Sequence, residues 1–219
     1  VRGVGTSEPL FIFFILTSLA MAYQGKHWWA SILGSLAVLT RSPGIFLFGA
    51  YSLALWRKPK AFTPYLLMPM ALVLLFTFYG NRFGNFWAYF NSSSELHPIF
   101  FPPFLIFSNT AKWITDMWRE DIIYIYLFYG LGLSLVKEKT LKIFGFIVGT
   151  LLLLTAHRDL ARYALPIAPI ALLGYAPLIE KIPKKAWYLL AVLLIPIYLF
   201  SWQFVLRNIQ PISDWSVFI

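Results

Sequence analysis

The sequence predicts an all-α, polytopic integral membrane protein with about eight hydrophobic helices, two of which form a short hairpin pair. Hydrophobic residues make up 59% of the 219 residues. Charged residues make up only 12%, whereas soluble domains carry about 25%. Aromatic residues reach 19%, and Trp and Tyr recur near the ends of apolar segments, where membrane proteins meet lipid headgroups. We therefore expect the chain to lie in a bilayer.

Eight apolar runs are separated by polar or basic turns. They fall at residues 9–23, 28–39, 45–56, 62–79, 122–136, 141–156, 164–179 and 187–206. A full crossing needs roughly 20 helical residues, so several helices must extend into their flanks or end inside the protein. The short runs at 28–39 and 45–56 either cross fully or form a re-entrant hairpin. In both cases the pair leaves the orientation of later helices unchanged.

We expect one transmembrane helical domain over residues 1–219. The chain begins at Val1 without a methionine or signal peptide, so we expect it to be a fragment. Residues 80–121 form the one long connection, rich in Asn, Ser, Pro and aromatic residues, and we expect a partly structured exterior loop there. The absence of cysteine excludes disulfides and thiol chemistry.

Basic residues concentrate in four short turns, which sets the predicted orientation. Ten of the 18 Lys and Arg residues lie at Lys26, 57–60, 137–142 and 180–185. Dense Lys and Arg in short loops marks the cytoplasmic side of a membrane. Residue 1, residues 80–121, the segment around 156–169 and the C-terminus then face the exterior or lumen. Topology therefore accounts for the net charge of +9, and we expect no nucleic-acid partner.

Three polar clusters lie at the predicted exterior ends of helices. The first is Thr6-Ser7-Glu8-Pro9. Thr6 or Ser7 can cap a helix here, Pro9 suits its first turn, and Glu8 favours the positive end of the helix dipole. Helix capping alone explains this cluster.

The second cluster is Thr40-Arg41-Ser42-Pro43-Gly44, between the two short runs. It is either a plain interhelical turn with Arg41 reaching the headgroups, or a turn below the surface in a protein-lined cavity. A buried arginine is costly and needs an anion. A carboxylate such as that of Glu8, or a ligand phosphate, would satisfy it.

The third cluster lies in AHRDLARYALPIAP, residues 156–169, where His157, Arg158, Asp159, Arg162 and Tyr163 fall within two helical turns. A capped helix with an Asp159–Arg162 pair is one interpretation. The other is a phosphate clamp of two arginines beside an apolar span. The prolines at 166 and 169 are expected to break or bend the helix.

Known catalytic motifs are absent: the sequence has no HExxH, Gly-rich nucleotide loop, GxSxG or three-histidine set. We therefore expect no metal site from these residues. The adjacent acids Glu120 and Asp121 could bind a cation or act as a base, but they also suit the start of a helix.

Together these motifs resemble the GT-C polytopic membrane glycosyltransferases, in particular the PIG-V-like mannosyltransferases. Glu8, the Trp28-Trp29 pair and Thr40–Gly44 match in order and spacing, and HRDLARYALPIAP resembles the family's His-x-x-x-x-Arg-Tyr-x-x-Pro segment. The resemblance covers roughly residues 5–56 and 156–170. It implies transfer of a sugar, such as mannose in this family, from a polyprenyl-phosphate-linked donor to a lipid or protein acceptor.

The same resemblance implies a site on the exterior or lumenal face of a prokaryotic plasma membrane or the endoplasmic reticulum. The expected catalytic acid lies upstream of Val1, so the chain alone is expected to be inactive and Glu8 does not replace that acid. The substrate-binding residues would be Glu8, Arg41, His157, Arg158, Arg162 and Tyr163. Membrane lipid and the lipid-linked sugar phosphate are the expected partners, and a divalent metal stays an open option.

Two other classes of protein remain open. A transporter or flippase for an anionic lipid-linked substrate could bind through the same arginines without catalysis, although such proteins often contain inverted repeats, which this sequence lacks. A non-catalytic membrane subunit with capped helix ends needs no ligand.

Overall fold

The computed structural model describes residues 7–93, 120–155 and 160–207. The regular structure in these ranges is helical, which confirms the predicted all-α class. The chain divides into two compact units, Val1–Tyr175 and Ala176–Ile219, and each is considered separately. Unit 1 contains all the residues of the candidate site described below.

Each of the eight predicted apolar runs is largely helical. Unit 1 contains α1 (Glu8–Tyr23), α2 (His27–Thr40), η1 (Ser42–Ile45), α3 (Phe46–Leu55), α4 (Pro59–Phe62), η2 (Thr63–Leu66), α5 (Leu67–Phe83), α6 (Ala88–Ser93), η4 (Glu120–Tyr129), α8 (Gly130–Leu135), α9 (Lys139–Leu154), α10 (Leu160–Ala164) and the start of α11 (Ala168–Ile179). Unit 2 contains α12 (Lys184–Arg207). The segments η1 and η2 are 3₁₀ helices, and η4 is a π-helix.

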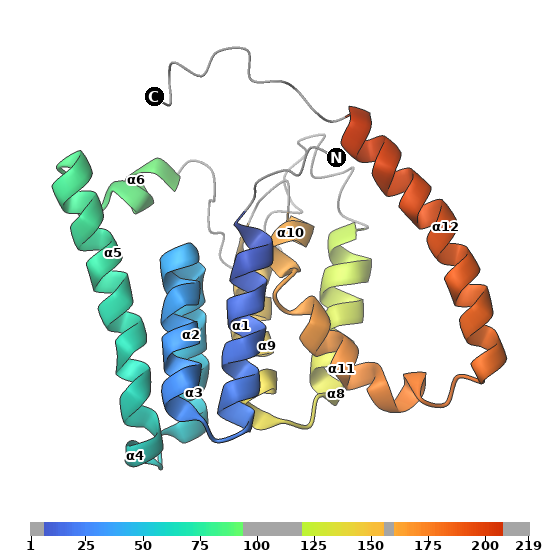
Figure 1. The fold of residues 1–219 in the computed structure, drawn as a ribbon, viewed down its shortest axis with the longest axis horizontal. Coiled ribbons are helices and arrows are strands. Elements are labelled where there is room, and N and C mark those ends of the chain that lie inside the picture. Colours follow the sequence, from blue (N-terminus) through green and yellow to red (C-terminus); the bar gives the residue numbers. More distant parts are fainter. Residues whose placement is uncertain (1–6, 94–119, 156–159, 208–219) are drawn as a thin grey trace. The chain divides into compact units, whose positions relative to one another are not determined.

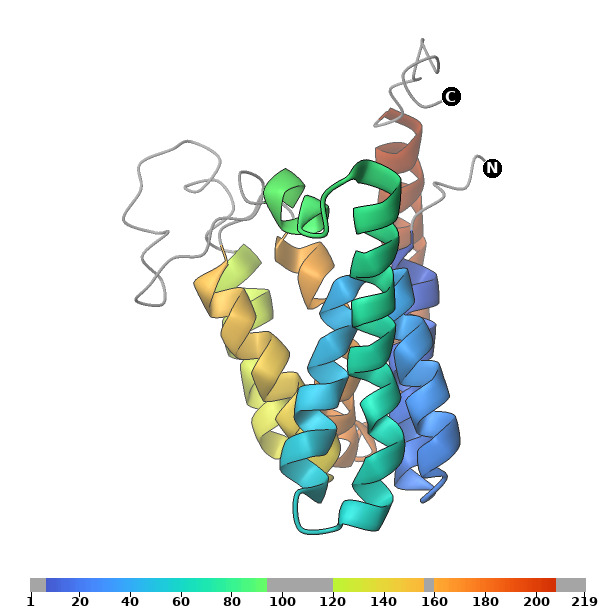
Figure 2. The same ribbon diagram turned by 90° about the vertical axis from the view of Figure 1, so that its left-hand side faces the viewer.

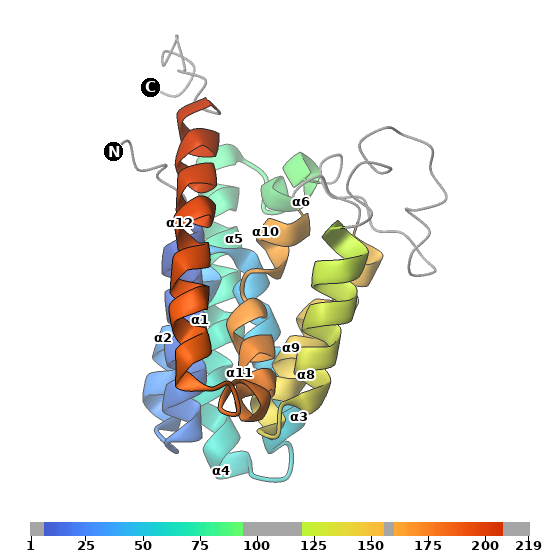
Figure 3. The same cartoon turned by 90° about the vertical axis from the view of Figure 1, so that its right-hand side faces the viewer.

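Successive helices of unit 1 run in opposite directions (Figures 1 and 2). The chain descends through α1, returns through α2, descends through α3 and returns through α5, and η4–α8 and α9 form a similar pair. The turns at 24–26, 56–58 and 136–138 therefore lie at one end of unit 1. The start of α1, the α2–η1 junction and α10 lie at the other end, as Figures 1 and 3 both show.

Helix length limits how the described segments can cross a membrane. Pro59–Phe83, which combines α4, η2 and α5, is long and apolar enough for a crossing, with a mean hydropathy of 1.8 over its best window. Glu8–Tyr23, Ser42–Leu55, Ile123–Leu135 and Ala168–Ile179 are apolar but shorter. At 1.5 Å per residue the 16 residues of α1 extend about 24 Å, less than the roughly 30 Å of a hydrocarbon core. The multi-pass arrangement stays a prediction.

The core of unit 1 contains a buried polar chain in addition to apolar side chains. The Ser18 hydroxyl donates to the carbonyl of Ala30 at 2.7 Å and lies 2.9 Å from the hydroxyl of Tyr51. The ring of Tyr51 stacks on Tyr65 at 4.1 Å, and the Tyr65 hydroxyl lies 2.9 Å from His27 Nδ1. Since buried hydroxyls need partners, these contacts fix the register of α1, α2, α3 and η2 against one another.

Glycine permits the close approach of the α2–η1 junction. A Cβ on Gly44 would lie 2.6 Å from the backbone carbon of Ala37 and the backbone nitrogen of Val38. Only a residue without a side chain fits there, so the chain can fold back tightly directly after Arg41.

Three boundaries differ from the sequence predictions. Thr6 or Ser7 was the predicted cap of the first helix. Ser7 has helical backbone angles and makes no capping bond through its side chain, and Thr6 lies outside the described residues. The Ser7 carbonyl accepts from the amide of Phe11 at 2.9 Å. The helix predicted to end at Tyr79 continues to Phe83, where Gly84 ends it in the left-handed conformation at φ 68°, and α6 follows. These helical residues shorten the predicted 80–121 loop, most of which lies outside the described residues.

Candidate functional site

The site is built around Glu8, the first residue of α1. Its side chain is only 9% exposed, which is unusual for a carboxylate at a helix start. Pro9 in the first turn and the bond from Phe11 to the Ser7 carbonyl hold the helix start, while the carboxylate turns toward other elements. A buried carboxylate needs compensating charge, because burial removes its hydration.

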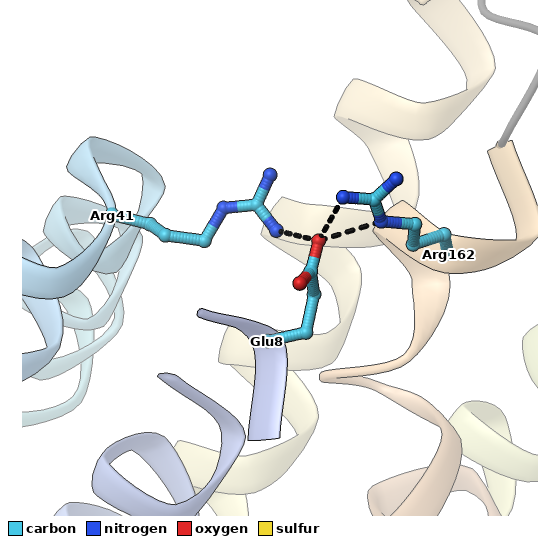
Figure 4. A network of polar contacts seen from close by, with 3 residues as sticks. All are labelled: Glu8, Arg41 and Arg162. Atoms are coloured by element: carbon cyan, nitrogen blue, oxygen red, sulfur yellow. Dashed lines mark hydrogen bonds and ion pairs between the residues drawn. The ribbon is translucent and has the colours of Figure 1, made fainter. Parts of the chain in front are cut away.

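Two arginines supply that charge, and both bind the same oxygen of Glu8 (Figure 4). Arg41 Nη1 donates to Oε1 at 2.7 Å. Arg162 Nε donates to Oε1 at 2.6 Å, and its Nη2 lies 2.5 Å from the same atom. The cluster thus joins α1, the α2–η1 junction and α10, with one negative and two positive charges.

The chain around Arg41 fixes the direction of its side chain. Its backbone is extended, at φ −151° and ψ 128°, so α2 ends at Thr40 and the arginine lies between two helical segments. Its guanidinium carbon lies 6.0 Å from the ring centre of Phe11 and 5.7 Å from that of Tyr163. Aromatic faces attract a guanidinium at these distances, so Arg41 is held by a carboxylate and by two rings.

Arg162 is the more accessible of the two arginines. Its side chain is 48% exposed, compared with 23% for Arg41. It lies on α10, a short helix anchored by the buried residues Leu160 and Ala164. The helix then breaks at residues 165–167 before α11, as the proline at 166 predicts. Arg162 therefore stands between the buried carboxylate and the surroundings of unit 1.

The cluster lies short of the end of unit 1. Glu8 and Arg41 mark the ends of α1 and α2, whereas α5 continues past those ends and leads to α6 (Figures 1 and 2). An aromatic group surrounds Phe76 at that far end, with ring centres of Phe86, Trp87 and Phe90 within 5.5–6.2 Å of its ring. The Arg41 side chain is mostly covered by protein, and whether its turn lies below a membrane surface stays a prediction.

The predicted site residues divide into two groups. Glu8, Arg41, Arg162 and Tyr163 come together, although Arg162 is 154 positions from Glu8. His157 and Arg158 lie outside the described residues, as does the predicted Asp159 pairing.

Sequence reasoning missed Phe11, which is buried and contacts Arg41. Phe11 follows Glu8 by three positions, so the two residues share one face of the helix. That spacing is the signal which could have identified it. The apolar pattern of α1 gave no reason to separate Phe11 from other core residues.

No group of three His, Cys, Asp or Glu side chains suited to a metal occurs within the described ranges. The side chains of Glu120 and Asp121 are not described, so the prediction for that pair lies outside the described residues. What the cluster offers chemically is hydrogen-bond donors and positive charge for an anion.

Fold and site together define an all-α helical protein with a buried carboxylate clamped by two arginines at the end of one helical unit. Comparisons with family models, curated proteins and solved structures found no match for the chain.

Proposed function

We propose that this chain is part of a multi-pass membrane glycosyltransferase that binds the phosphate of a polyprenyl-linked sugar donor at the Arg41–Glu8–Arg162 cluster. The observation that carries the proposal is that two guanidinium groups, Arg41 and the half-exposed Arg162, converge on one oxygen of Glu8. Guanidinium groups that bind a carboxylate oxygen can bind the oxygens of a phosphodiester in the same way.

Exposed apolar side chains support a membrane environment. A band of large aliphatic side chains faces outward between the two ends of unit 1; it includes Leu10, Leu36, Leu53, Met70, Val73, Leu74, Leu127 and Leu131, each at least 38% exposed. Soluble proteins rarely expose so many large apolar side chains. Several described helices are apolar along their length, as expected for lipid contact.

The depth of the cluster suits a substrate that arrives through lipid. If the basic turns lie at one membrane interface, the 16 residues of α1 place Glu8 about 24 Å away from that interface. The hydrocarbon core is roughly 30 Å thick, so the arginines would lie just inside its opposite edge. A lipid-linked phosphate reaches this depth by diffusing within the membrane. A free ion would have to leave water and enter the edge of the hydrocarbon core.

The proposed reaction is an exchange of substituents at the anomeric carbon of the donor. A bond forms from the acceptor hydroxyl oxygen to that carbon, and the bond from the carbon to the phosphate oxygen breaks. The hydroxyl proton goes to a carboxylate acting as general base, a role that is not assigned to any residue of the described chain. Polyprenyl phosphate leaves with the electron pair, and Arg41 and Arg162 offset its increased negative charge.

Phosphate binding can be tested separately from catalysis. Binding of farnesyl phosphate to the purified full-length protein in detergent would be measured by thermal shift and by isothermal calorimetry. Arg41→Ala and Arg162→Ala should each weaken binding by about ten-fold or more, since a charge-assisted hydrogen bond contributes about 1.5–3 kcal/mol. Arg82→Ala, which removes an exposed arginine of α5, is the matched control. Unchanged binding in both cluster variants would refute the phosphate clamp.

Sugar transfer needs a second measurement, namely release of polyprenyl phosphate from polyprenyl-phosphate mannose in the full-length protein. Loss of release in both variants, with normal membrane insertion, supports the transferase. Wild-type binding without release, together with movement of the lipid across vesicles, would favour the transporter or flippase. Failure to bind farnesyl phosphate at all would leave the structural subunit as the better interpretation.

A further inference from the structure

The end of unit 1 opposite the arginine cluster carries a dense group of cations, here called the basic end. It comprises Lys26 of the α1–α2 turn, Arg57, Lys58 and Lys60 around the start of α4, and Lys137, Lys139 and Lys142 around the start of α9. All are exposed except Lys142, which is partly buried. Three turns far apart in the sequence are brought together here by the antiparallel packing (Figure 1).

The protein itself neutralises little of this charge. Glu138 is the single acid in these three turns, and its carboxylate accepts from the amide of Leu141 at 2.5 Å, capping α9. In the described part of the chain no ion pair involves any cation of the basic end. Seven positive charges facing one committed carboxylate create a strong field, which favours an anionic partner.

Exposed aromatic rings occupy the same end. Tyr23 is 80% exposed, Trp28 and Trp29 are each 62% exposed, and Trp56 is 67% exposed. The guanidinium carbon of Arg57 lies 4.7 Å from the ring centre of Trp56. Trp and Tyr combine an apolar ring with a polar edge and are most stable where apolar and hydrated layers meet. Such rings would be poorly placed in bulk water.

The surroundings of the rings favour lipid over the other polyanions. Outward-facing Leu53 and Leu66 continue from the basic end into the aliphatic band of unit 1. A surface that binds nucleic acid is instead expected to be a groove with rings stacked in sequence. Here the rings come from the ends of three different helices and lie between the cations and apolar side chains. Headgroups, glycerol and acyl chains follow one another in the same order in one leaflet of a bilayer.

We propose that the basic end is a binding surface for anionic phospholipid headgroups, with the lysines and arginine contacting phosphates and the Trp and Tyr rings inserted beside the glycerol layer. This inference rests on the membrane placement in the proposed function but is independent of sugar transfer and of the arginine cluster. Each basic residue near an anionic lipid surface strengthens binding by roughly five-fold. The protein should therefore discriminate between anionic and zwitterionic lipids of the same acyl chains.

The test uses the full chain purified in a neutral detergent, with dioleoyl phosphatidylglycerol and dioleoyl phosphatidylcholine added separately. Lipid binding is measured by thermal shift and by native mass spectrometry. We expect phosphatidylglycerol to bind at least about ten-fold more tightly, and this preference to fall as salt rises and shortens the screening length. The triple variant Arg57→Gln, Lys58→Gln, Lys60→Gln should lose most of the preference, while its unfolding temperature in phosphatidylcholine stays unchanged.

A single-charge comparison covers the case in which the triple variant does not fold. Lys58→Gln should weaken phosphatidylglycerol binding several-fold, whereas Arg82→Gln, at the opposite end of α5, should not. Equal binding of both lipids by the wild type would overturn the proposal, and so would tighter binding of a single-stranded oligonucleotide. Retained lipid preference in Arg162→Ala separates this surface from the proposed donor site, and its loss there would assign the anionic lipid to the arginine cluster instead.

Discussion

Arg162 Nε donates to Glu8 Oε1 at 2.6 Å, which joins α10 to the first turn of α1 across 154 positions of sequence. The same oxygen accepts from Arg41 at 2.7 Å. One carboxylate oxygen therefore connects three segments that are far apart in the sequence. The contact determines both the local structure at this end of unit 1 and the charge that an anion would encounter there.

Glu8→Gln should destabilise the protein by about 3 kcal/mol, because breaking a buried ion pair leaves uncompensated charge. This value is the low end of the roughly 3–5 kcal/mol typical of a broken buried ion pair, since Arg162 is half exposed and keeps part of its hydration. Chemical denaturation in detergent measures the change. Glu138→Gln is the matched control: this carboxylate caps α9, and its loss should cost about 1 kcal/mol or less. Equal effects of the two variants would contradict a special role for Glu8.

The Glu8–Arg162 contact should appear as a coupling energy. In a double-mutant cycle with Glu8→Gln and Arg162→Gln, we expect the combined variant to be more stable than the sum of the single changes by about 0.5–3 kcal/mol. Unfolding free energies of the four proteins give this value. A cycle of Glu8→Gln with Arg82→Gln should give a value near zero, because Arg82 lies in α5 and is not an ion-pair partner of Glu8.

Arg41→Lys should weaken the cluster although it retains the charge. An ammonium group lacks the planar face that Arg41 presents between the rings of Phe11 and Tyr163. We expect a loss of about 1 kcal/mol in stability. Arg82→Lys, which changes an exposed arginine of α5, is the control and should be close to neutral. Thermal unfolding of the two variants under identical detergent conditions measures the difference, and equal effects would contradict a stabilising role for the rings.

Gly44→Ala should be strongly destabilising despite the small size of the change. The new methyl would lie 2.6 Å from backbone atoms of Ala37 and Val38, which cannot rotate away. Such overpacking costs typically 1–3 kcal/mol, and we also expect weaker anion binding because Arg41 would shift. Gly130→Ala is the control, since a Cβ there meets nothing within 4 Å, and it should be neutral or slightly stabilising in a helix.

The hydrogen-bonded hydroxyls of Ser18 and Tyr51 should contribute unequally to stability. Tyr51→Phe removes one bond but leaves Ser18 bonded to the carbonyl of Ala30, so the cost should be about 1 kcal/mol. Ser18→Ala leaves the fully buried Tyr51 hydroxyl without its Ser18 partner, and the cost should reach about 1–3 kcal/mol. Unfolding free energies compare the two changes. A larger loss for Tyr51→Phe would contradict this assignment of the two hydrogen bonds.

Local sequence was sufficient for most of the elements. Apolar runs identified the longer helices, and the breaks at Ser42–Gly44 and 165–167 fell where prolines interrupt those runs. Helix α6 was missed, because it lies in the predicted 80–121 loop. Alternation alone also grouped the basic turns of unit 1, at Lys26, 57–60 and 137–142, at one end of that unit. The fourth predicted turn, 180–185, belongs to unit 2. Predicted boundaries were less accurate: Ser7 has helical backbone angles and does not cap α1 through its side chain.

Sequence also selected Glu8, Arg41 and Arg162 as candidates, since ionisable residues beside apolar runs are costly. It left open whether the anion for Arg41 was a carboxylate or a ligand, and it gave no sign that Phe11 would flank the guanidinium. Only the tertiary structure decided that one oxygen of Glu8 accepts from both arginines. The physical reason is that charge pairing depends on distance in space, and residues 8, 41 and 162 become neighbours only when α1, α2 and α10 pack at the same end.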